Sequence, residues 1–295
     1  MNNGFKCELH MHSTYSDGSI SPAGLLQHAV NIGLSVVAIT DHDNARGARE
    51  AIPVAQELGL ECIPAIEFTG RWDDCFRPDW GGDVDVLGYF VDLENPQFKA
   101  MEQATLDDIH GRIEECCARL TAAGYPVSME DVFAENPRYG GARQLRLALQ
   151  HKGYADSYDA SVQLFTEHWQ HVRLSSFTIE EHIAAIQAAG GVAVMAHPVG
   201  VRCGEGWLTA DRMARVVEIG MDGIEVYHRS MNAEARAYFL DLALQFDLLI
   251  SGGSDEHGWS PDLPYMGTEP VTREMVEALR ARHLERCASV KRSFS

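Results

Sequence analysis

The 295-residue sequence lacks several patterns that define whole classes of protein. Its seven cysteines are scattered and odd in number, and no CxxC pair occurs, which argues against a disulfide scaffold or a zinc ribbon. No run approaches the roughly 20 apolar residues of a membrane-spanning helix. The first residues contain no apolar stretch of the kind found in signal peptides. We therefore expect a cytoplasmic protein with reduced thiols and no membrane association.

Positive charge is also scarce. Acidic residues outnumber basic ones by 43 to 24, and the formal net charge is −19. Such a surface repels phosphate backbones and anionic membranes, so a stable complex with long nucleic acid is not expected. A small anionic substrate is still compatible with this charge where metal ions or local arginines hold it. Neither GxGxxG nor GxxxxGK[ST] follows the first predicted strand, which disfavours a nucleotide-binding doubly wound fold.

The sequence does contain a regular alternation of secondary-structure signals. β-branched apolar runs predict strands, and capping residues predict the helix ends between them. Repeated strand–helix units indicate an α/β fold with a parallel sheet or barrel. The predicted strands cover residues 6–12, 35–40, 60–67, 84–91, 191–196, 223–227 and 248–251, and the predicted helices cover residues 21–33, 45–58, 96–123, 179–189, 209–219, 233–246 and 274–284.

One long span interrupts this alternation. Residues 101–173 contain no convincing strand and are interpreted as a helical insertion that forms a lid or substrate subdomain. Residues 1–100 and 174–295 would then form the main unit. Residues 70–83 are rich in Trp, Asp, Pro and Gly and are expected to form a surface loop.

Five of the predicted strands end in imidazole or carboxylate side chains. Side chains two residues apart on a strand point to the same face, so His10 and His12 can bind one metal ion together. Each signal alone has a plain structural alternative, such as turn chemistry for Asp17 or a helix cap after the second strand. The remaining strand-end candidates are His42, Glu67, His197, Asp255 and His257.

Together these strand ends indicate a metal centre. In βα barrels the carboxyl ends of the strands carry the catalytic groups. Mixed imidazole and carboxylate ligands suit Zn²⁺, Mn²⁺ or Fe²⁺ better than Ca²⁺ or a thiolate-bound metal. Eight potential ligands are too many for one tetrahedral ion, so two or three divalent ions are expected.

One set of segments resembles the PHP family of metal-dependent phosphoesterases. It consists of HMHSTYSDG, TDHD, AHP and GSDEH, together with the strand-end Glu67. The resemblance runs from His10 to about Gly267. It implies a distorted seven-stranded βα barrel, similar to a TIM barrel, with three metals at the carboxyl ends of the strands. The small bacterial branch with a helical insertion is most similar. Activities in that branch include a phosphatase on 3′,5′-nucleotide bisphosphates and a 5′-to-3′ exonuclease on short RNA.

The resemblance also distributes the ligands residue by residue. The first metal would be held by His10, His12, Glu67 and Asp255, and the second by Asp17, His42 and His257. Glu67 would bridge to a third metal shared with His197. The family pattern has a His where this chain has Asp85. Asp85 would be an oxygen ligand, which would favour Mn²⁺, Fe²⁺ or Mg²⁺ over Zn²⁺ at that position.

Other candidates concern the substrate. Arg143 matches the arginine of an Arg-x-His element of this branch, with Leu145 in place of the His, and is predicted to bind a substrate phosphate. A solvated helix arginine is the alternative. His228 and Arg229 follow the strand at residues 223–227, and we expect them to donate a proton and to contact phosphate respectively. Three tryptophans could stack on a base or simply pack in the fold, namely Trp72, Trp80 and Trp169.

The implied reaction is hydrolysis of a phosphate monoester by attack of a metal-bridged hydroxide. Metal coordination lowers the pKa of water from about 15.7 to about 7. The expected substrate is a small phosphorylated molecule, such as a nucleotide of the 3′,5′-bisphosphate type or a short oligonucleotide. Two alternatives stay open. An amidohydrolase-like C–N hydrolase would use similar ligands, although no strand-end Lys is present to bridge two metals. A catalytically inactive PHP module would bind metal without turnover.

Overall fold

The computed structural model describes residues 5–72, 83–169, 175–201, 206–260 and 262–293. Its first three strands form a small parallel sheet in the order β1 (Cys7–Glu8), β2 (Val36–Ala38) and β3 (Glu61–Ile63). Helices α1 (Pro22–Asn31) and α2 (Arg46–Leu58) connect these strands. The side chain of Ser21 caps α1, and Gly59 ends α2 in the left-handed conformation at φ 73°.

The other five strands form a second, mixed sheet. Strand β5 (Asp83–Tyr89) runs antiparallel to both β4 (Ala65–Arg71) and β6 (Val192–Met195). Strands β7 (Gly223–His228) and β8 (Leu249–Gly253) follow in parallel. The sequence predicted parallel strands throughout, and β5 shows where this was wrong. Apolar periodicity reports that a strand is buried, but not the direction in which it runs.

The predicted strand at residues 60–67 is in fact two strands. Pro64 lies between β3 and β4, and proline cannot donate a backbone hydrogen bond to a strand ladder. The chain therefore leaves the first sheet at Ile63 and enters the second at Ala65. The predicted loop at residues 70–83 is also shorter at its ends, because β4 continues to Arg71 and β5 begins at Asp83. Residues 73–82 of that loop lie outside the described residues.

The described strands form two sheets rather than the closed seven-stranded barrel that was expected. The sheets nevertheless meet at the ends of their strands. The segment after β1 pairs with the segment after β8 through Met11 and Glu256, and the segment after β2 pairs with β4 through His42 and Glu67. These two bridges bring together the predicted strand-end ligands.

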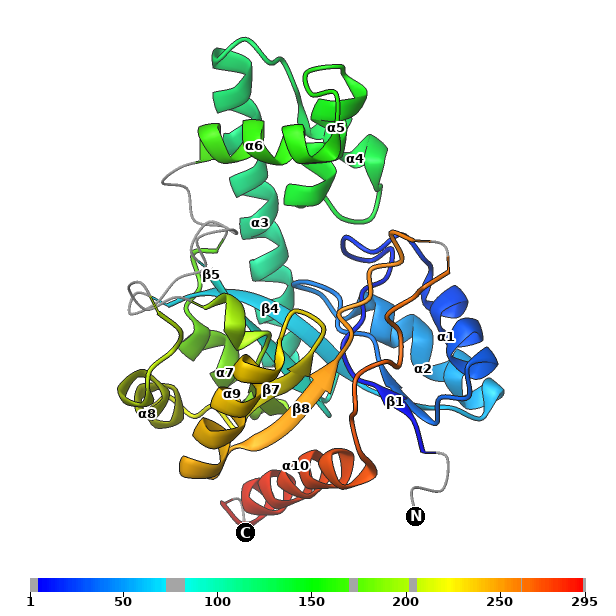
Figure 1. Cartoon of the computed structure of the whole chain (residues 1–295), viewed down its shortest axis with the longest axis vertical. Coiled ribbons are helices and arrows are strands. Elements are labelled where there is room, and N and C mark those ends of the chain that lie inside the picture. The colour runs from blue at the N-terminus through cyan, green and yellow to red at the C-terminus, as the bar shows by residue number, and fades with distance from the viewer. Residues whose placement is uncertain (1–4, 73–82, 170–174, 202–205, 261, 294–295) are drawn as a thin grey trace.

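Helices cover the outer faces of the sheets (Figure 1). Helices α1 and α2 cover the first sheet. The second sheet is covered by α7 (Ile179–Ala188), α8 (Ala210–Glu218), α9 (Ala233–Gln245) and α10 (Arg273–Ser293), with a short 3₁₀ turn at Pro198–Gly200. The largest core packs α7, α8 and α9 against the second sheet and includes Phe68, Ile186, Ile224 and Phe239. Burying each such side chain contributes about 1.5–3 kcal/mol to folding. No described helix is both long enough and apolar enough to cross a membrane.

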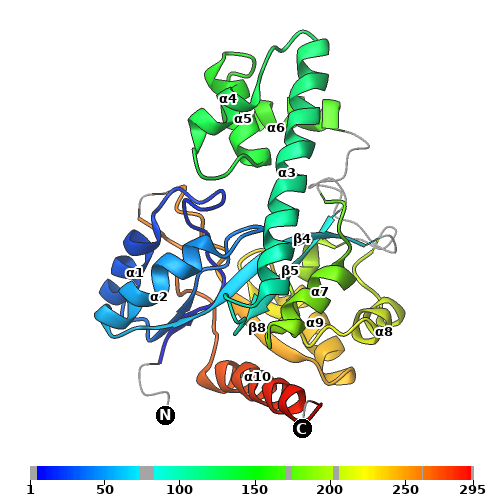
Figure 2. The same cartoon turned by 180° about the vertical axis from the view of Figure 1, so that it is seen from behind.

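The insertion stands on one side of the two sheets, as Figures 1 and 2 show. Helix α3 (Pro96–Ala122) runs from the second sheet into it, and α4 (Met129–Glu135), α5 (Ala142–His151) and α6 (Tyr158–Trp169) pack around the far end of α3. These helices enclose a core of their own, which includes Ile113, Leu120, Val132 and Leu149. Because α3 is continuous across residue 101, the division of the chain at residues 101 and 173 stays a prediction.

Candidate metal centre

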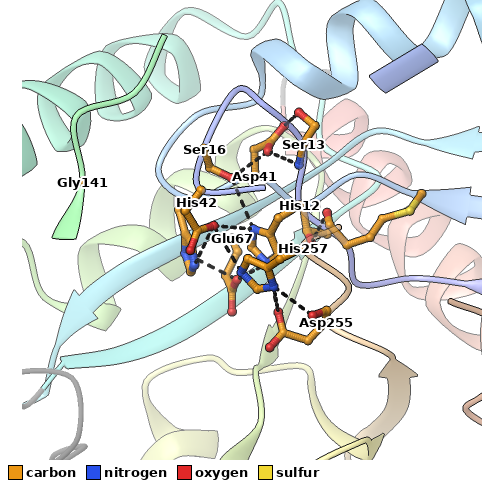
Figure 3. Close-up of polar contacts among 12 residues, drawn as sticks. His12, Ser13, Ser16, Asp41, His42, Glu67, Gly141, Asp255 and His257 are labelled. Atoms are coloured by element: carbon orange, nitrogen blue, oxygen red, sulfur yellow. Dashed lines mark hydrogen bonds and ion pairs between the residues drawn. The ribbon is translucent and has the colours of Figure 1, made fainter. Parts of the chain in front are cut away.

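The candidate site lies where the two sheets meet. His10 and His12 follow β1, and the Nε2 atom of each lies 3.1 Å from Oε2 of Glu67 on β4. The Nε2 atom of His12 is also 3.2 Å from Oδ1 of Asp255, which follows β8. All four residues are predicted ligands of the first metal. Figure 3 shows the side chains of His12, Glu67, Asp255 and His257 turned toward one another.

The predicted ligands of the second metal form an adjoining group. Oδ1 of Asp17 is 3.2 Å from Nε2 of His257 and 4.0 Å from Nε2 of His42. Nδ1 of His42 is 3.5 Å from Oε2 of Glu67. One ligand atom from each of His12, Asp17, His42 and His257 lies within 4.8 Å of the others. Glu67 therefore contacts both groups.

The predicted ligands of the third metal lie on the other oxygen of Glu67. Its Oε1 atom is 3.0 Å from Nε2 of His197, which follows β6. The same nitrogen is 3.7 Å from Oδ2 of Asp85 on β5. His42, Glu67 and Asp85 also place ligand atoms within 4.8 Å of one another. The structure thus brings all nine sequence-predicted ligands into one cluster, and their role as ligands stays a proposal.

The donor atoms of this cluster suit divalent cations. Three of its buried atoms, His12 Nε2, Asp17 Oδ1 and His42 Nδ1, have no hydrogen-bond partner among the described residues. Each of these atoms lies 3.1–4.0 Å from a carboxylate oxygen or an imidazole nitrogen of the cluster, but the angles are not those of a hydrogen bond. Buried polar atoms without a partner are rare and costly. Converging imidazole nitrogens and carboxylate oxygens are the ligand set that Zn²⁺, Mn²⁺ and Fe²⁺ accept, so the residues fit such ions.

The electrostatics of the cluster agree with this fit. Burial lowers the pKa of His12, but the carboxylates of Asp255 and Glu67 outweigh burial and raise that pKa to about 10. Burial raises the pKa of Glu67, yet His10 and His42 hold it well below its ordinary value. The carboxylates thus stay ionised and attract positive charge. Divalent ions would supply that charge in place of protons on the imidazoles.

Local backbone geometry aims two of the ligands. His197 and Asp255 each follow a strand with a positive φ, of 26° and 53°. Residues other than glycine rarely adopt such values, and where they do, the surrounding structure must enforce them. Gly253, at the end of β8, passes so close to the chain at His10 that any side chain at position 253 would overlap His10. This close approach sets Asp255 beside the first pair of histidines.

Two further buried acids support the cluster. Sequence analysis did not single out Glu225, and it considered Asp43 only within the TDHD segment, with a helix cap as the alternative. Oε1 of Glu225 on β7 accepts a hydrogen bond from Nδ1 of His10 at 2.9 Å, and Oε2 accepts one from the backbone N–H of His197 at 2.7 Å. Asp43 accepts hydrogen bonds from the Thr69 backbone and the Tyr139 hydroxyl, and burial raises its pKa to about 7. A charged residue inside the apolar strand GIEVY was the available signal for Glu225.

The predicted proton donor reaches the edge of the cluster. His228 ends β7 in a buried position, and its Nε2 atom lies 3.4 Å from Oδ2 of Asp255. Its Nδ1 atom accepts a hydrogen bond from the backbone N–H of Ser230 at 3.1 Å. The same nitrogen lies 2.6 Å from the hydroxyl oxygen of Ser230, so Nδ1 is held at Ser230 and Nε2 faces the cluster.

Each predicted phosphate-binding arginine lines a pocket at the cluster. Arg143 shares one pocket with Asp17, His42 and Asp85. Arg229 shares a second pocket with His42, Asp85 and Asp255. Nη2 of Arg229 is 3.7 Å from Oδ2 of Asp255. His42 and Asp85 border both pockets, which therefore meet at the cluster.

Of the three candidate tryptophans, only Trp72 has a side chain within the described residues. Trp72 is buried in the core of the second sheet, which supports the packing alternative over stacking on a base. Trp80 and the side chain of Trp169 lie outside the described residues. The exposed tryptophan beside the cluster is Trp259, which follows Asp255 and His257 and which sequence analysis did not single out.

Comparison with known proteins identifies the family. The PHP domain model matches residues 8–218. The chain belongs to the PHP family. A phosphoribosyl 1,2-cyclic phosphate 1,2-diphosphodiesterase from Eggerthella lenta is 28% identical, with 88% of this chain and 97% of that protein covered. A 5′-3′ exoribonuclease from Haemophilus influenzae is 30% identical, with 86% and 92% covered.

A 3′,5′-nucleoside bisphosphate phosphatase from Chromobacterium violaceum is 25% identical over 94% of this chain and 97% of its own length. Among solved structures, one from Bifidobacterium adolescentis superposes on this chain with a TM-score of 0.80 at 27% identity. It is described as a metal-dependent phosphoesterase, and the match covers 96% of this chain and 98% of that one. The PHP chain described here is therefore a hydrolase of the metal-dependent phosphoesterase class.

Proposed function

We propose that this PHP enzyme hydrolyses a phosphate monoester of a nucleotide, either a 3′,5′-bisphosphate or the 5′ end of a short oligonucleotide. The observation that carries the proposal is the pair of pockets that meet at His42 and Asp85, with Arg143 in one and Arg229 in the other. A substrate with two phosphate groups could place one in each pocket. The exoribonuclease and the bisphosphate phosphatase among the relatives support this choice of substrate.

The nine clustered side chains would hold two or three divalent ions. We propose His10, His12, Glu67 and Asp255 for the first, Asp17, His42 and His257 for the second, and Glu67, His197 and Asp85 for the third. When bound, such ions lower the pKa of water and neutralise charge on phosphate oxygens. Imidazole and carboxylate ligands are compatible with Mn²⁺, Zn²⁺ and Fe²⁺, and Asp85 would also accept Mg²⁺.

The protein's own groups would act around the phosphate. Arginine binds phosphate oxygens through paired N–H donors, so Arg143 and Arg229 would orient the substrate. His228, when protonated on both ring nitrogens, would donate the Nε2 proton to the leaving oxygen and keep its Nδ1 proton on the hydroxyl of Ser230. The buried position of His228 keeps bulk water from competing for this proton transfer.

An assay of phosphate release tests the proposal. The products are also separated by chromatography, because cleavage of a phosphodiester in the RNA or the cyclic phosphate frees no inorganic phosphate. Adenosine 3′,5′-bisphosphate, AMP, histidinol phosphate, a cyclic ribose phosphate and a short 5′-phosphorylated RNA would be compared in Mn²⁺. We expect faster release from the bisphosphate or the RNA than from the other three. Release from none of them, by protein with metal shown to be bound, would contradict the nucleotide proposal. Parallel assays on amide substrates separate it from C–N hydrolysis.

Two variants connect such activity to the cluster. Replacing Asp255 or His42 with Ala should lower turnover by at least about a thousandfold, because each removes a proposed ligand from a centre that stabilises developing charge. The variants should stay folded, as judged by circular dichroism. Glu218→Ala is a suitable control, since Glu218 is an exposed residue of α8 that pairs only with Arg215 among the described residues. Full activity in the Asp255 or His42 variant would reject the site.

A further inference from the structure

The guanidinium group of Arg143 lies against two aromatic rings. Its central carbon is 4.0 Å from the ring centroid of Trp259 and 5.0 Å from that of Tyr158. Both distances fall within the range of about 6 Å in which cation–π attraction is significant. Arg143 and Tyr158 belong to helices α5 and α6 of the insertion, whereas Trp259 belongs to the segment after β8. The contact between Arg143 and Trp259 therefore connects the insertion to the segment that carries Asp255 and His257.

Trp259 is itself attached to the metal centre. Its indole N–H donates a hydrogen bond to the backbone oxygen of Asp17 at 3.1 Å. Its ring centroid lies 4.4 Å from that of His257. The side chain is nonetheless 43% exposed, so burial in a core does not explain its position. Its contacts join Arg143 to two proposed metal ligands.

The hydrogen-bonding edge of Arg143 is left available by this arrangement. Within the described part of the chain, no carboxylate pairs with its guanidinium, although the protein has 43 acidic residues. Stacking against a ring uses the flat face of a guanidinium and leaves its in-plane N–H donors for another partner. The pocket that Arg143 lines contains Asp17, His42 and Asp85. An anion held by the metal centre would therefore meet these donors.

We propose that Trp259 is a positioning residue, which holds Arg143 beside the metal cluster so that Arg143 binds a phosphate group of the substrate. The inference rests on the proposed function in that the substrate carries phosphate. Trp259 does not bind phosphate itself. It fixes a long and otherwise flexible side chain in advance, and such ordering strengthens binding by lowering the entropy lost on association.

Calorimetric titration of inorganic phosphate into the manganese-loaded protein tests this inference directly. We expect Arg143→Ala and Trp259→Leu to weaken phosphate binding by about five- to tenfold, a loss that lies between the strengths of an exposed and of a desolvated cation–π contact. Trp259→Phe keeps an aromatic face and should stay within about twofold of the wild type. The double variant with Arg143→Ala and Trp259→Leu should bind no more weakly than Arg143→Ala alone. Trp207→Leu serves as the control, because Trp207 packs on Tyr238 and Phe239 instead.

Three results would overturn the inference. Unchanged phosphate affinity in Arg143→Ala would show that Arg143 is no phosphate ligand. Unchanged affinity in Trp259→Leu would show that Trp259 does not position it. Loss of metal together with phosphate in Trp259→Leu, measured by elemental analysis, would show that Trp259 serves Asp17 and His257 rather than Arg143.

Steady-state kinetics then separate this inference from the proposed function. With adenosine 3′,5′-bisphosphate and with p-nitrophenyl phosphate, Trp259→Leu should raise KM by about five- to tenfold and leave kcat within about twofold. If the wild type turns over no nucleotide but phosphate binding follows the expected pattern, the proposed substrate is wrong and the role of Trp259 stands. If nucleotide turnover is rapid and both Trp259→Leu and Trp259→Phe behave as wild type, the role of Trp259 is wrong and the proposed substrate stands.

Discussion

The carboxylate of Glu225 accepts a hydrogen bond from Nδ1 of His10, at 2.9 Å, and both groups are fully buried. This bond fixes one imidazole proton on Nδ1 and turns Nε2 toward Glu67 and Asp255, where a bound ion would take the place of the Nε2 proton. The second oxygen of Glu225 holds the backbone of His197. One carboxylate thus orients two proposed ligands that come from different strands, which is a common arrangement behind metal-binding histidines.

Replacing Glu225 with Gln should weaken metal binding. An amide has one acceptor oxygen, whereas Glu225 uses both of its oxygens as acceptors, so one of the two hydrogen bonds must be lost. We expect affinity for Mn²⁺ or Zn²⁺ to fall by about 10- to 100-fold, as is usual for partners behind metal ligands. Competition with a chromogenic chelator measures the affinity. Equal affinity in Glu225→Gln and the wild type would contradict this role.

Removal of metal should destabilise the fold. Without divalent ions, the buried carboxylates of the cluster face one another with only imidazoles to balance them. Treatment with a chelator should lower Tm by several degrees, and addition of Mn²⁺ should restore it, because a ligand that binds only the folded state stabilises that state. Differential scanning calorimetry gives the shift. The rise in Tm on addition of Mn²⁺ should be smaller for Asp255→Asn than for the wild type. An equal rise in Tm would argue against Asp255 as a ligand.

Gly253→Ala should be disruptive despite its small size. A methyl group there would overlap His10, so either the end of β8 or the first histidine pair must move. We expect a loss of more than about 2 kcal/mol in the free energy of unfolding, together with weaker metal binding. Gly111→Ala is the matched comparison, since Gly111 lies within α3 with open space around it. This substitution should raise the free energy of unfolding by about 0.5–1 kcal/mol. Urea titration of both variants provides the values.

His182 should make stability depend on pH. It is buried, its ring stacks on Phe68 with centroids 4.5 Å apart, and burial lowers its pKa from 6.5 to about 3. In the unfolded chain it titrates near pH 6.5, so protons bind the unfolded state first as the pH falls. The contribution of neutral His182 to the free energy of unfolding is complete above pH 6.5. It is lost progressively between pH 6.5 and 3, at up to about 1.4 kcal/mol per pH unit.

Denaturant titrations at several pH values test this expectation. The free energy of unfolding of the wild type should fall more steeply from pH 6.5 to pH 5 than that of His182→Leu. The variant removes one titrating group and keeps an apolar side chain next to Phe68. Parallel curves for the two proteins would show that His182 does not carry this pH dependence.

Much of the fold and the family could be predicted because the informative residues are local. His10 and His12 lie two residues apart just after one strand, which ends at Glu8 and not at His12 as predicted, and Asp255 and His257 repeat that spacing after another. Proline and glycine mark the helix ends, and the alternation of elements follows from them. The PHP family and the phosphoesterase class are confirmed by the comparisons. The assignment of individual residues to individual metals stays a prediction.

What could not be predicted depends on contacts between distant parts of the chain. The direction of β5 and the transfer between sheets at Pro64 follow from strand pairing, which no local pattern encodes. Glu225 belongs to no motif, and its role appears only when His10, 215 residues away, is beside it. Trp259 likewise acquires meaning from Arg143 and Asp17.

The insertion leaves the second sheet after β5 and returns at α7, and it has a hydrophobic core separate from that of the sheets. A unit attached in this way can change its sequence, or be exchanged for another, without altering the strands that carry the histidines and carboxylates. Among the described residues, Tyr139 and Arg143 reach from it to the centre, and Asn136 and Gln144 bond to the backbone beside Asp17. Evolution could therefore retarget such an enzyme to a new phosphorylated compound by remodelling α4 to α6 while its hydrolytic chemistry is inherited intact.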